Sequence, residues 1–145
     1  MTRESFASLR TRLTTELAPE QLQQLQAAMI EVSNPNNPVT ATSRFTSWFH
    51  YVAIIEDGRE ILIEEVINYL MIRDYIEAAM RLLSVTTREP VHAIVNDADR
   101  RYLDATTADD GEFFGRYFGI PDDRDLWWWR RRPHDVSGLV GEPYP

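Results

Sequence analysis

A chain of 145 residues has the length of one domain, and its 43% of hydrophobic residues is enough for one apolar core. The absence of cysteine excludes disulfides, thiolate metal sites and cysteine nucleophiles. No apolar run reaches the length of a membrane span, and the first residues lack the basic-then-apolar pattern of a signal peptide. We therefore expect a cytoplasmic protein that makes no contact with a membrane.

The net charge of −8 is unevenly distributed along the chain. Residues 89–125 contain ten acidic residues and four arginines, the opposite of the balance that most nucleic-acid-binding proteins show. Direct binding of nucleic acid is therefore not expected. All 15 basic residues are arginine, so the chain has no lysine for Schiff-base or phosphate-loop chemistry.

Helical spacing of apolar residues begins near the N-terminus. Residues 4–17 and 19–32 each place an apolar side chain at every third or fourth position, and Pro19 suits the first turn of the second helix. The segment 34–42 contains two prolines and several asparagines, which predicts a loop.

The middle of the chain contains a long predicted helix and a shorter segment with two readings. Residues 43–56 fit a helix, although Asp57 and Gly58 would also suit a hairpin turn into residues 59–63. The helix is favoured, because both faces of such a strand would be apolar. Residues 60–84 have a clear helical period.

Residues 90–107 fit either a helix or a hairpin with strands at 91–95 and 101–105. Residues 112–118 predict a short aromatic helix that Gly119 closes, followed by a last turn that carries three tryptophans. The predicted fold is mainly α: a compact helical domain of five to seven helices, with a short β-hairpin near residues 91–104, and hence an α+β fold, as the alternative. Residues 1–133 form the single globular domain, and residues 134–145 form a flexible C-terminal tail.

A run of tryptophans and arginines near the C-terminus is the most distinctive feature of the sequence. On a helix three consecutive indoles spread over roughly 200° of the circumference, and on a strand the middle ring faces away from its neighbours. One apolar face therefore cannot hold all three. Because tryptophan and arginine dominate interface hot spots, the run predicts a partner-binding surface, while packing of the same rings in the core is the competing interpretation. The residues are Trp127, Trp128, Trp129, Arg130, Arg131 and Arg132.

The sequence predicts no catalytic residues, no metal site and no cofactor. Paired carboxylates such as Glu60 and Glu64, or Asp74 and Glu77, lack the histidine three residues later that a di-metal bundle uses. They are interpreted as a solvated helix face. Recognised nucleophile, zinc and phosphate-loop motifs are absent from the sequence. The prediction is a non-enzymatic protein-binding or adaptor protein whose acidic region attracts a basic partner.

Three alternatives stay open at this point. The aromatic end would serve a homodimer as well as a foreign partner. The acidic region would also suit an inhibitor that mimics nucleic acid and occupies the groove of a DNA- or RNA-handling protein. A small-molecule site within the helical bundle, around His50, Tyr51, Tyr69 and the glutamates of the long helix, is the third alternative.

Overall fold

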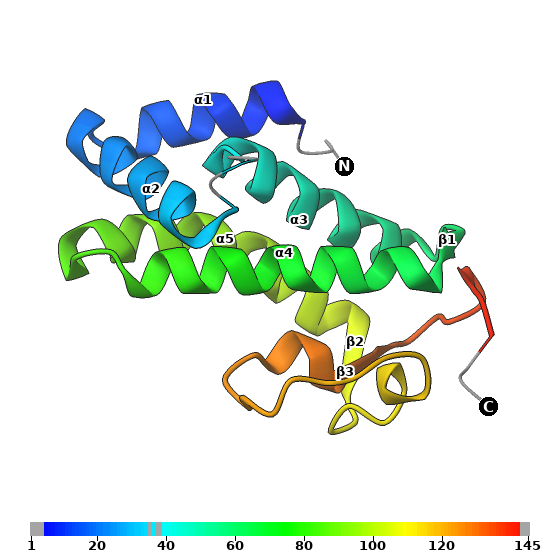
Figure 1. The fold of residues 1–145 in the computed structure, drawn as a ribbon. Coiled ribbons are helices and arrows are strands. Elements are labelled where there is room, and N and C mark those ends of the chain that lie inside the picture. The colour runs from blue at the N-terminus through cyan, green and yellow to red at the C-terminus, as the bar shows by residue number, and fades with distance from the viewer. Residues whose placement is uncertain (1–4, 35, 37–38, 143–145) are drawn as a thin grey trace.

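The computed structural model describes residues 5–34, 36 and 39–142, which fold into a helical bundle with a C-terminal segment packed on one side (Figure 1). The described residues form five α-helices, which confirms the mainly α prediction. The helices are α1 (Phe6–Glu16), α2 (Pro19–Val32), α3 (Ala41–Asp57), α4 (Ile63–Arg81) and α5 (Val85–Ala105).

Local sequence signals account for most of the helix ends. The Ser5 hydroxyl accepts from the Ser8 backbone N–H in a capping box, and the Thr40 hydroxyl caps α3 by accepting from the Ser43 backbone N–H. Pro19 occupies the first turn of α2, as expected. Gly58 ends α3 in the left-handed conformation, at φ 61°, where a residue without Cβ is favoured.

Helix α5 covers the region for which a hairpin was the alternative, so no hairpin lies at residues 91–104. Val91, Ile94, Val95, Ala98 and Tyr102 are all buried, and only a helix turns residues at this spacing toward one side. Pro90 lies within the first two turns and cannot donate a backbone hydrogen bond.

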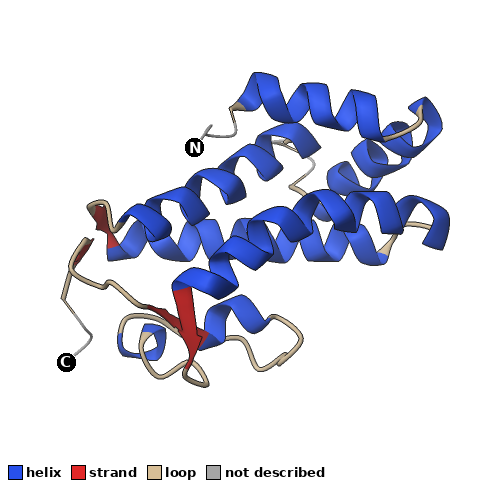
Figure 2. Ribbon diagram, turned by 180° about the vertical axis from the view of Figure 1, so that it is seen from behind, coloured by secondary structure: helices blue, strands red, loops and turns tan. Residues whose placement is uncertain are grey.

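Four short strands are the β component of the fold (Figure 2). β1 (Ile61–Leu62) pairs in parallel with β4 (Leu139–Val140), and β2 (Thr106–Ala108) pairs antiparallel with β3 (Arg131–Pro133). Part of the predicted tail, residues 134–142, therefore contains a strand, and Val136 and Leu139 pack against the core. Residues 143–145 of that tail lie outside the described residues.

Helix α3 is the centre of the bundle. It packs against α1, α4 and α5, and ten of its 17 residues are buried. The chain after α5 covers the side of the bundle opposite α1 (Figures 1 and 2). It contains two short 3-10 helices, η1 (Phe114–Arg116) and η2 (Trp127–Arg130), in the places where a short aromatic helix and a last turn were predicted.

Candidate functional site

The tryptophan–arginine segment, residues 127–132, forms η2 and β3. Trp128 and Trp129 are buried, whereas Trp127 is half-buried. The Trp127 ring meets Trp128 edge-on, with 5.5 Å between centroids. The tight 3-10 turn thus buries two of the three indoles and leaves the first partly exposed, packed against the core and 6.1 Å from the Tyr102 ring.

Asp74 of α4 holds both buried indoles. Its Oδ1 atom accepts a hydrogen bond from Trp128 Nε1 at 2.7 Å and from Trp129 Nε1 at 2.8 Å. Burial raises the pKa of the Asp74 carboxyl above its usual range, although the two indole donors and Arg73 act in the opposite direction. A single partly buried carboxylate therefore ties the C-terminal segment to the bundle.

The neighbouring residue, Arg73, forms a buried ion pair with Asp99 beside Trp128. Its Nε and Nη2 atoms donate to the two oxygens of Asp99 at 3.0 and 2.8 Å, and Trp48 Nε1 donates to the same carboxylate at 2.9 Å. The guanidinium also lies over the Trp128 ring, 4.2 Å from its centroid. Arg73 Nη1 also donates to Glu77 at 3.2 Å, so this buried charge pair is well satisfied. The Tyr102 hydroxyl donates to the Trp128 carbonyl at 2.9 Å.

The three arginines of the segment have different surroundings. Arg130 contacts Asp110 and donates to the Pro121 carbonyl at 2.8 Å. Arg131 donates to the Thr106 hydroxyl and carbonyl. Arg132 is exposed, and its guanidinium lies 5.3 Å from the centroid of the Phe113 ring. Two of the three guanidiniums are thus engaged within the protein, and one faces solvent.

The sequence interpretation missed the structural role of Arg73 and Asp74. Asp74 and Glu77 were interpreted as a solvated face balanced by Arg73, yet Arg73 is only 2% exposed. One signal was present: Arg73 stands at the helical position between Leu70 and Ile76, in the apolar stripe of α4. An arginine in such a stripe predicts a buried partner.

The acidic region contributes fewer free carboxylates than its composition suggests. Five of its ten acids make ion pairs with arginines: Asp97, Asp99, Asp110, Glu112 and Asp123. Asp109 instead accepts from the backbone N–H groups of Gly111 and Phe113. The exposed carboxylates for which no ion pair is seen within the described chain include Asp104, Asp122 and Asp125.

Three residues of the predicted small-molecule site, His50, Tyr51 and Tyr69, lie together, and their rings pack against one another. Tyr51 is fully buried and stacks on Tyr69 at 5.2 Å, and burial raises its pKa well above the usual value. His50 lies 6.3 Å from the Tyr69 ring. Glu64 and Glu65 of α4 are exposed, and burial together with the charge of Glu65 raises the pKa of Tyr69.

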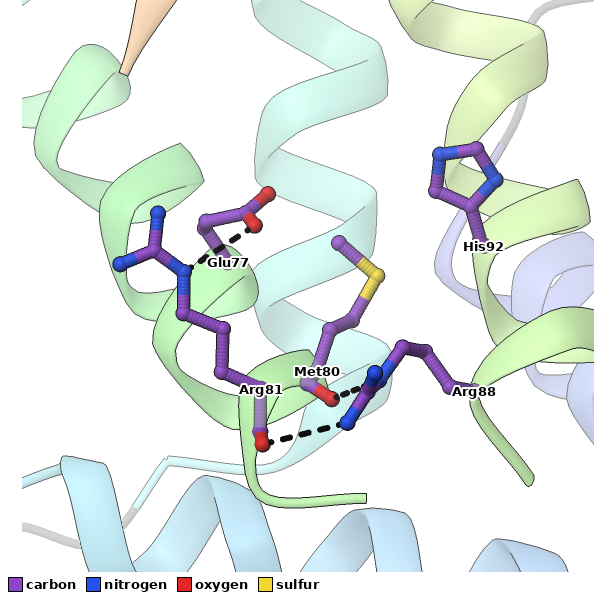
Figure 3. A pocket seen from close by; sticks show the side chains of 5 residues that line it. All are labelled: Glu77, Met80, Arg81, Arg88 and His92. Carbon is purple, nitrogen blue, oxygen red and sulfur yellow. Dashed lines mark hydrogen bonds and ion pairs between the residues drawn. The ribbon is translucent and has the colours of Figure 1, made fainter. Parts of the chain in front are cut away.

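A groove between α4 and α5 brings the second histidine near charged groups (Figure 3). It has a volume of about 280 Å³ and is lined by Glu77, Met80, Arg81, Arg88 and His92. Arg88 donates to the carbonyls of Met80 and Leu83, which caps the end of α4, and Arg81 donates to Glu77 at 3.4 Å. Arg88 thus caps the C-terminal end of α4, and Arg81 is paired with Glu77.

The third histidine, His134, lies beside β2, where its Nε2 atom is 2.8 Å from the Thr107 hydroxyl. Within the described parts of the chain, no group of three or more histidine or acidic side chains could hold a metal ion. None of the helices in those parts has both the length and the apolarity to cross a bilayer.

Comparisons with known proteins add no family to this geometry. A scan against protein-family models, a search of curated proteins and a search of solved structures each find no match.

Proposed function

We propose that this chain is a non-enzymatic protein-binding domain, and that Trp127 and Arg132 form the centre of its contact surface. The observation that carries the proposal is the exposed Arg132 guanidinium, for which no carboxylate partner is found among the described residues. Trp127, half-buried in the same segment, donates its indole N–H to none of the described residues. An accessible indole and an unpaired guanidinium are the side chains that contribute most at interface hot spots.

The buried part of the segment supports this role by fixing the backbone. Trp128 and Trp129 are held by Asp74, and Arg132 is held in register opposite Thr107 by the β2–β3 pairing. A contact surface that is already ordered loses less conformational entropy when a partner binds. The two sealed indoles are therefore positioning residues for the accessible one.

The charge distribution favours a basic partner. Asp104, Asp122 and Asp125 are exposed and have no ion pair with the described residues, and the chain carries a net charge of −8. Such a charge steers a basic partner during approach more than it tightens the final complex. The nucleic-acid-mimic alternative has less support, because half of the acidic region is neutralised by internal arginines.

The test is a double variant, Trp127→Ala with Arg132→Glu, against the control Arg100→Glu, which changes another exposed arginine. Proteins cross-linked to each version in cells of the source organism are identified, and the recovered partner is purified for calorimetric titration. We expect the double variant to lose roughly 10- to 100-fold in affinity, as truncation of hot-spot residues does, with an unchanged melting temperature. The control keeps the wild-type affinity.

Light scattering on the same proteins separates a foreign partner from a second copy. A wild-type dimer that the double variant dissociates would make the partner another copy of this chain. A partner that binds the double variant and the control equally well would contradict the proposed surface.

A further inference from the structure

Arg44 of α3 differs from the other arginines with limited exposure. It is half-buried, its guanidinium lies 4.4 Å from the centroid of the Tyr75 ring on α4, and its Nε atom is buried without a hydrogen-bond acceptor. Burial lowers its pKa from the usual value, since desolvation outweighs the tyrosine beside it. No carboxylate or carbonyl of a described residue accepts a hydrogen bond from this side chain.

Every other buried or half-buried arginine among the described residues has a carboxylate, carbonyl or hydroxyl oxygen within bonding or ion-pair distance: Arg12, Arg59, Arg73, Arg101, Arg130 and Arg131. Arg59 and Arg130 also have buried nitrogen atoms without a hydrogen-bond acceptor, but each of them contacts an oxygen through another nitrogen or an ion pair. A desolvated cation costs free energy unless an anion or a set of acceptors compensates it. No described residue supplies this compensation for Arg44, so an anion bound in contact with it would stabilise the guanidinium.

Arg44 lines an open hollow whose other walls fit a particular kind of anion. The hollow has a volume of about 320 Å³, within the range of small-ligand sites. Met71 and Ile72 of α4 supply an apolar wall, and the Asn68 amide adds a neutral polar group. Asn34 and Tyr75 complete the lining.

The geometry points to a binding site for a small monocarboxylate with an apolar or aromatic body, its carboxylate on Arg44 and its body against Met71 and Ile72. A guanidinium matches the two oxygens of a carboxylate in a bidentate pair, as Arg101 and Glu56 show in this protein. Among the described residues of the lining, Arg44 is the one cation, which suits a single negative charge better than a phosphate dianion. The site is separate from the tryptophan–arginine segment and does not depend on the proposed function.

The test is a titration of the ¹⁵N-labelled protein with benzoate, followed by NMR of the Arg44 Nε–H and Asn68 amide signals. The neutral benzamide and inorganic phosphate are titrated in parallel. We expect saturable shifts at both signals with benzoate only. Arg44→Gln should weaken benzoate binding roughly 10- to 100-fold, since a hydrogen-bonded charge pair is lost, while Arg100→Gln, at an exposed arginine, should bind as the wild type does.

A second variant covers the case in which Arg44→Gln fails to fold. Asn68 is exposed, so Asn68→Asp should leave the fold intact and place a negative charge in the hollow that weakens benzoate binding about tenfold. Gln23→Glu adds the same charge on another helix and should have no such effect. Equal shifts with benzamide, a stronger response to phosphate than to benzoate, or unchanged binding by Asn68→Asp would each overturn the inference.

Discussion

Asp97 and Asp99 lie two positions apart on α5, yet their ion pairs differ in burial. The side chains of Arg73 and Asp99 are 2% and 5% exposed, whereas those of Arg12 and Asp97 are 24% and 56% exposed. Both pairs have the same 2.8 Å separation between nitrogen and oxygen. The two positions therefore test how strongly burial determines the value of an ion pair.

We expect Asp99→Ala to lower the free energy of unfolding by about 3–5 kcal/mol, because it leaves Arg73 charged, buried and without its main acceptor. Asp97→Ala should cost about 1 kcal/mol or less, as exposed pairs do. Urea unfolding of both variants gives the comparison. Similar losses in the two variants would mean that the Arg73–Asp99 pair contributes no more than a surface pair.

Asp74 should make the stability depend on pH in the direction opposite to that of an ordinary ion-paired carboxylate. Its folded-state pKa is raised by burial above the unfolded value of about 3.8, so the folded protein binds the proton more tightly. This contribution to stability is complete below the unfolded pKa and is lost as the pH rises through the folded pKa. The folded protein therefore stabilises the protonated form of Asp74 relative to the ionised form.

Asp74→Asn removes this titration while keeping an oxygen for the two indole donors. We expect the stability of the variant relative to the wild type to increase as the pH rises from 4 to 7, measured by thermal unfolding at each pH. A relative stability that stays constant or decreases over this range would show that the folded-state pKa of Asp74 is not raised.

At the level of elements, helical spacing predicted the helices and left a hairpin as the alternative in two regions, 43–63 and 91–104, which contain most of α3 and of α5. Residues 91–95 have the apolar density of a strand and the spacing of a helix, and the sequence alone cannot say which surface they meet. In the structure this region is a helix that packs against α3. Ile94 and Tyr102 are both buried, and a helix places residues at this spacing on the same face. Pairing within β1–β4 joins segments that are distant in the chain, and no local pattern signals such a contact.

The candidate site was predictable in composition and not in geometry. The sequence identified the tryptophan–arginine segment as the place where one face cannot hold every indole, but not which ring is only half-buried; in the structure it is Trp127. The acceptor of the other two, Asp74, lies 54 and 55 residues earlier in the chain. The residues around Asp74 in the sequence do not differ from those around a solvent-exposed carboxylate on a helix. Only the tertiary structure shows that Asp74 accepts hydrogen bonds from two indoles.

The β1–β4 pair gives a prediction at the same level. A Cβ atom at Gly138 would lie 2.3 Å from the Arg59 carbonyl oxygen and 2.7 Å from that of Gly58, whereas one at Gly119 would meet nothing within 4 Å. Both backbone oxygens are fixed by the end of α3, so Gly138→Ala must displace the last strand and break the bond from the Ile61 N–H to the Gly138 carbonyl.

Hydrogen exchange should therefore show faster exchange at Ile61 and in β4 for Gly138→Ala, with a loss of stability of about 1–3 kcal/mol, as overpacking at a tight contact typically costs. Gly119→Ala is the matched control and should leave exchange in both strands unchanged. Unchanged exchange in Gly138→Ala would mean that β4 accommodates the methyl group without separating from β1.

At the level of the whole molecule, the C-terminal segment shares one core with the helices. Trp128 and Phe114 are fully buried among residues of the bundle, and the Arg73–Asp99 pair lies directly against Trp128. The segment after α5 is therefore a part of the cooperative unit and not an appendage.

We therefore expect urea unfolding to show a single transition. Tryptophan fluorescence, to which three residues of the segment contribute, and far-UV circular dichroism, which reports the helices, are the two probes. The two midpoints are expected to coincide, as they do for a two-state domain of this length. A fluorescence midpoint at a lower urea concentration than the dichroism midpoint would show that the segment detaches before the bundle unfolds.

Adjacent positions 73 and 74 on α4 set limits on changes in chain length. One residue more or less turns a helix by about 100° and moves it by about 1.5 Å, so a single deletion earlier in α4 would withdraw both side chains from Asp99 and from the indoles at once. The irregular, exposed residues 122–125 face no such constraint. We therefore expect insertions and deletions to be tolerated at residues 122–125. A single insertion or deletion in the first half of α4 should prevent the protein from folding.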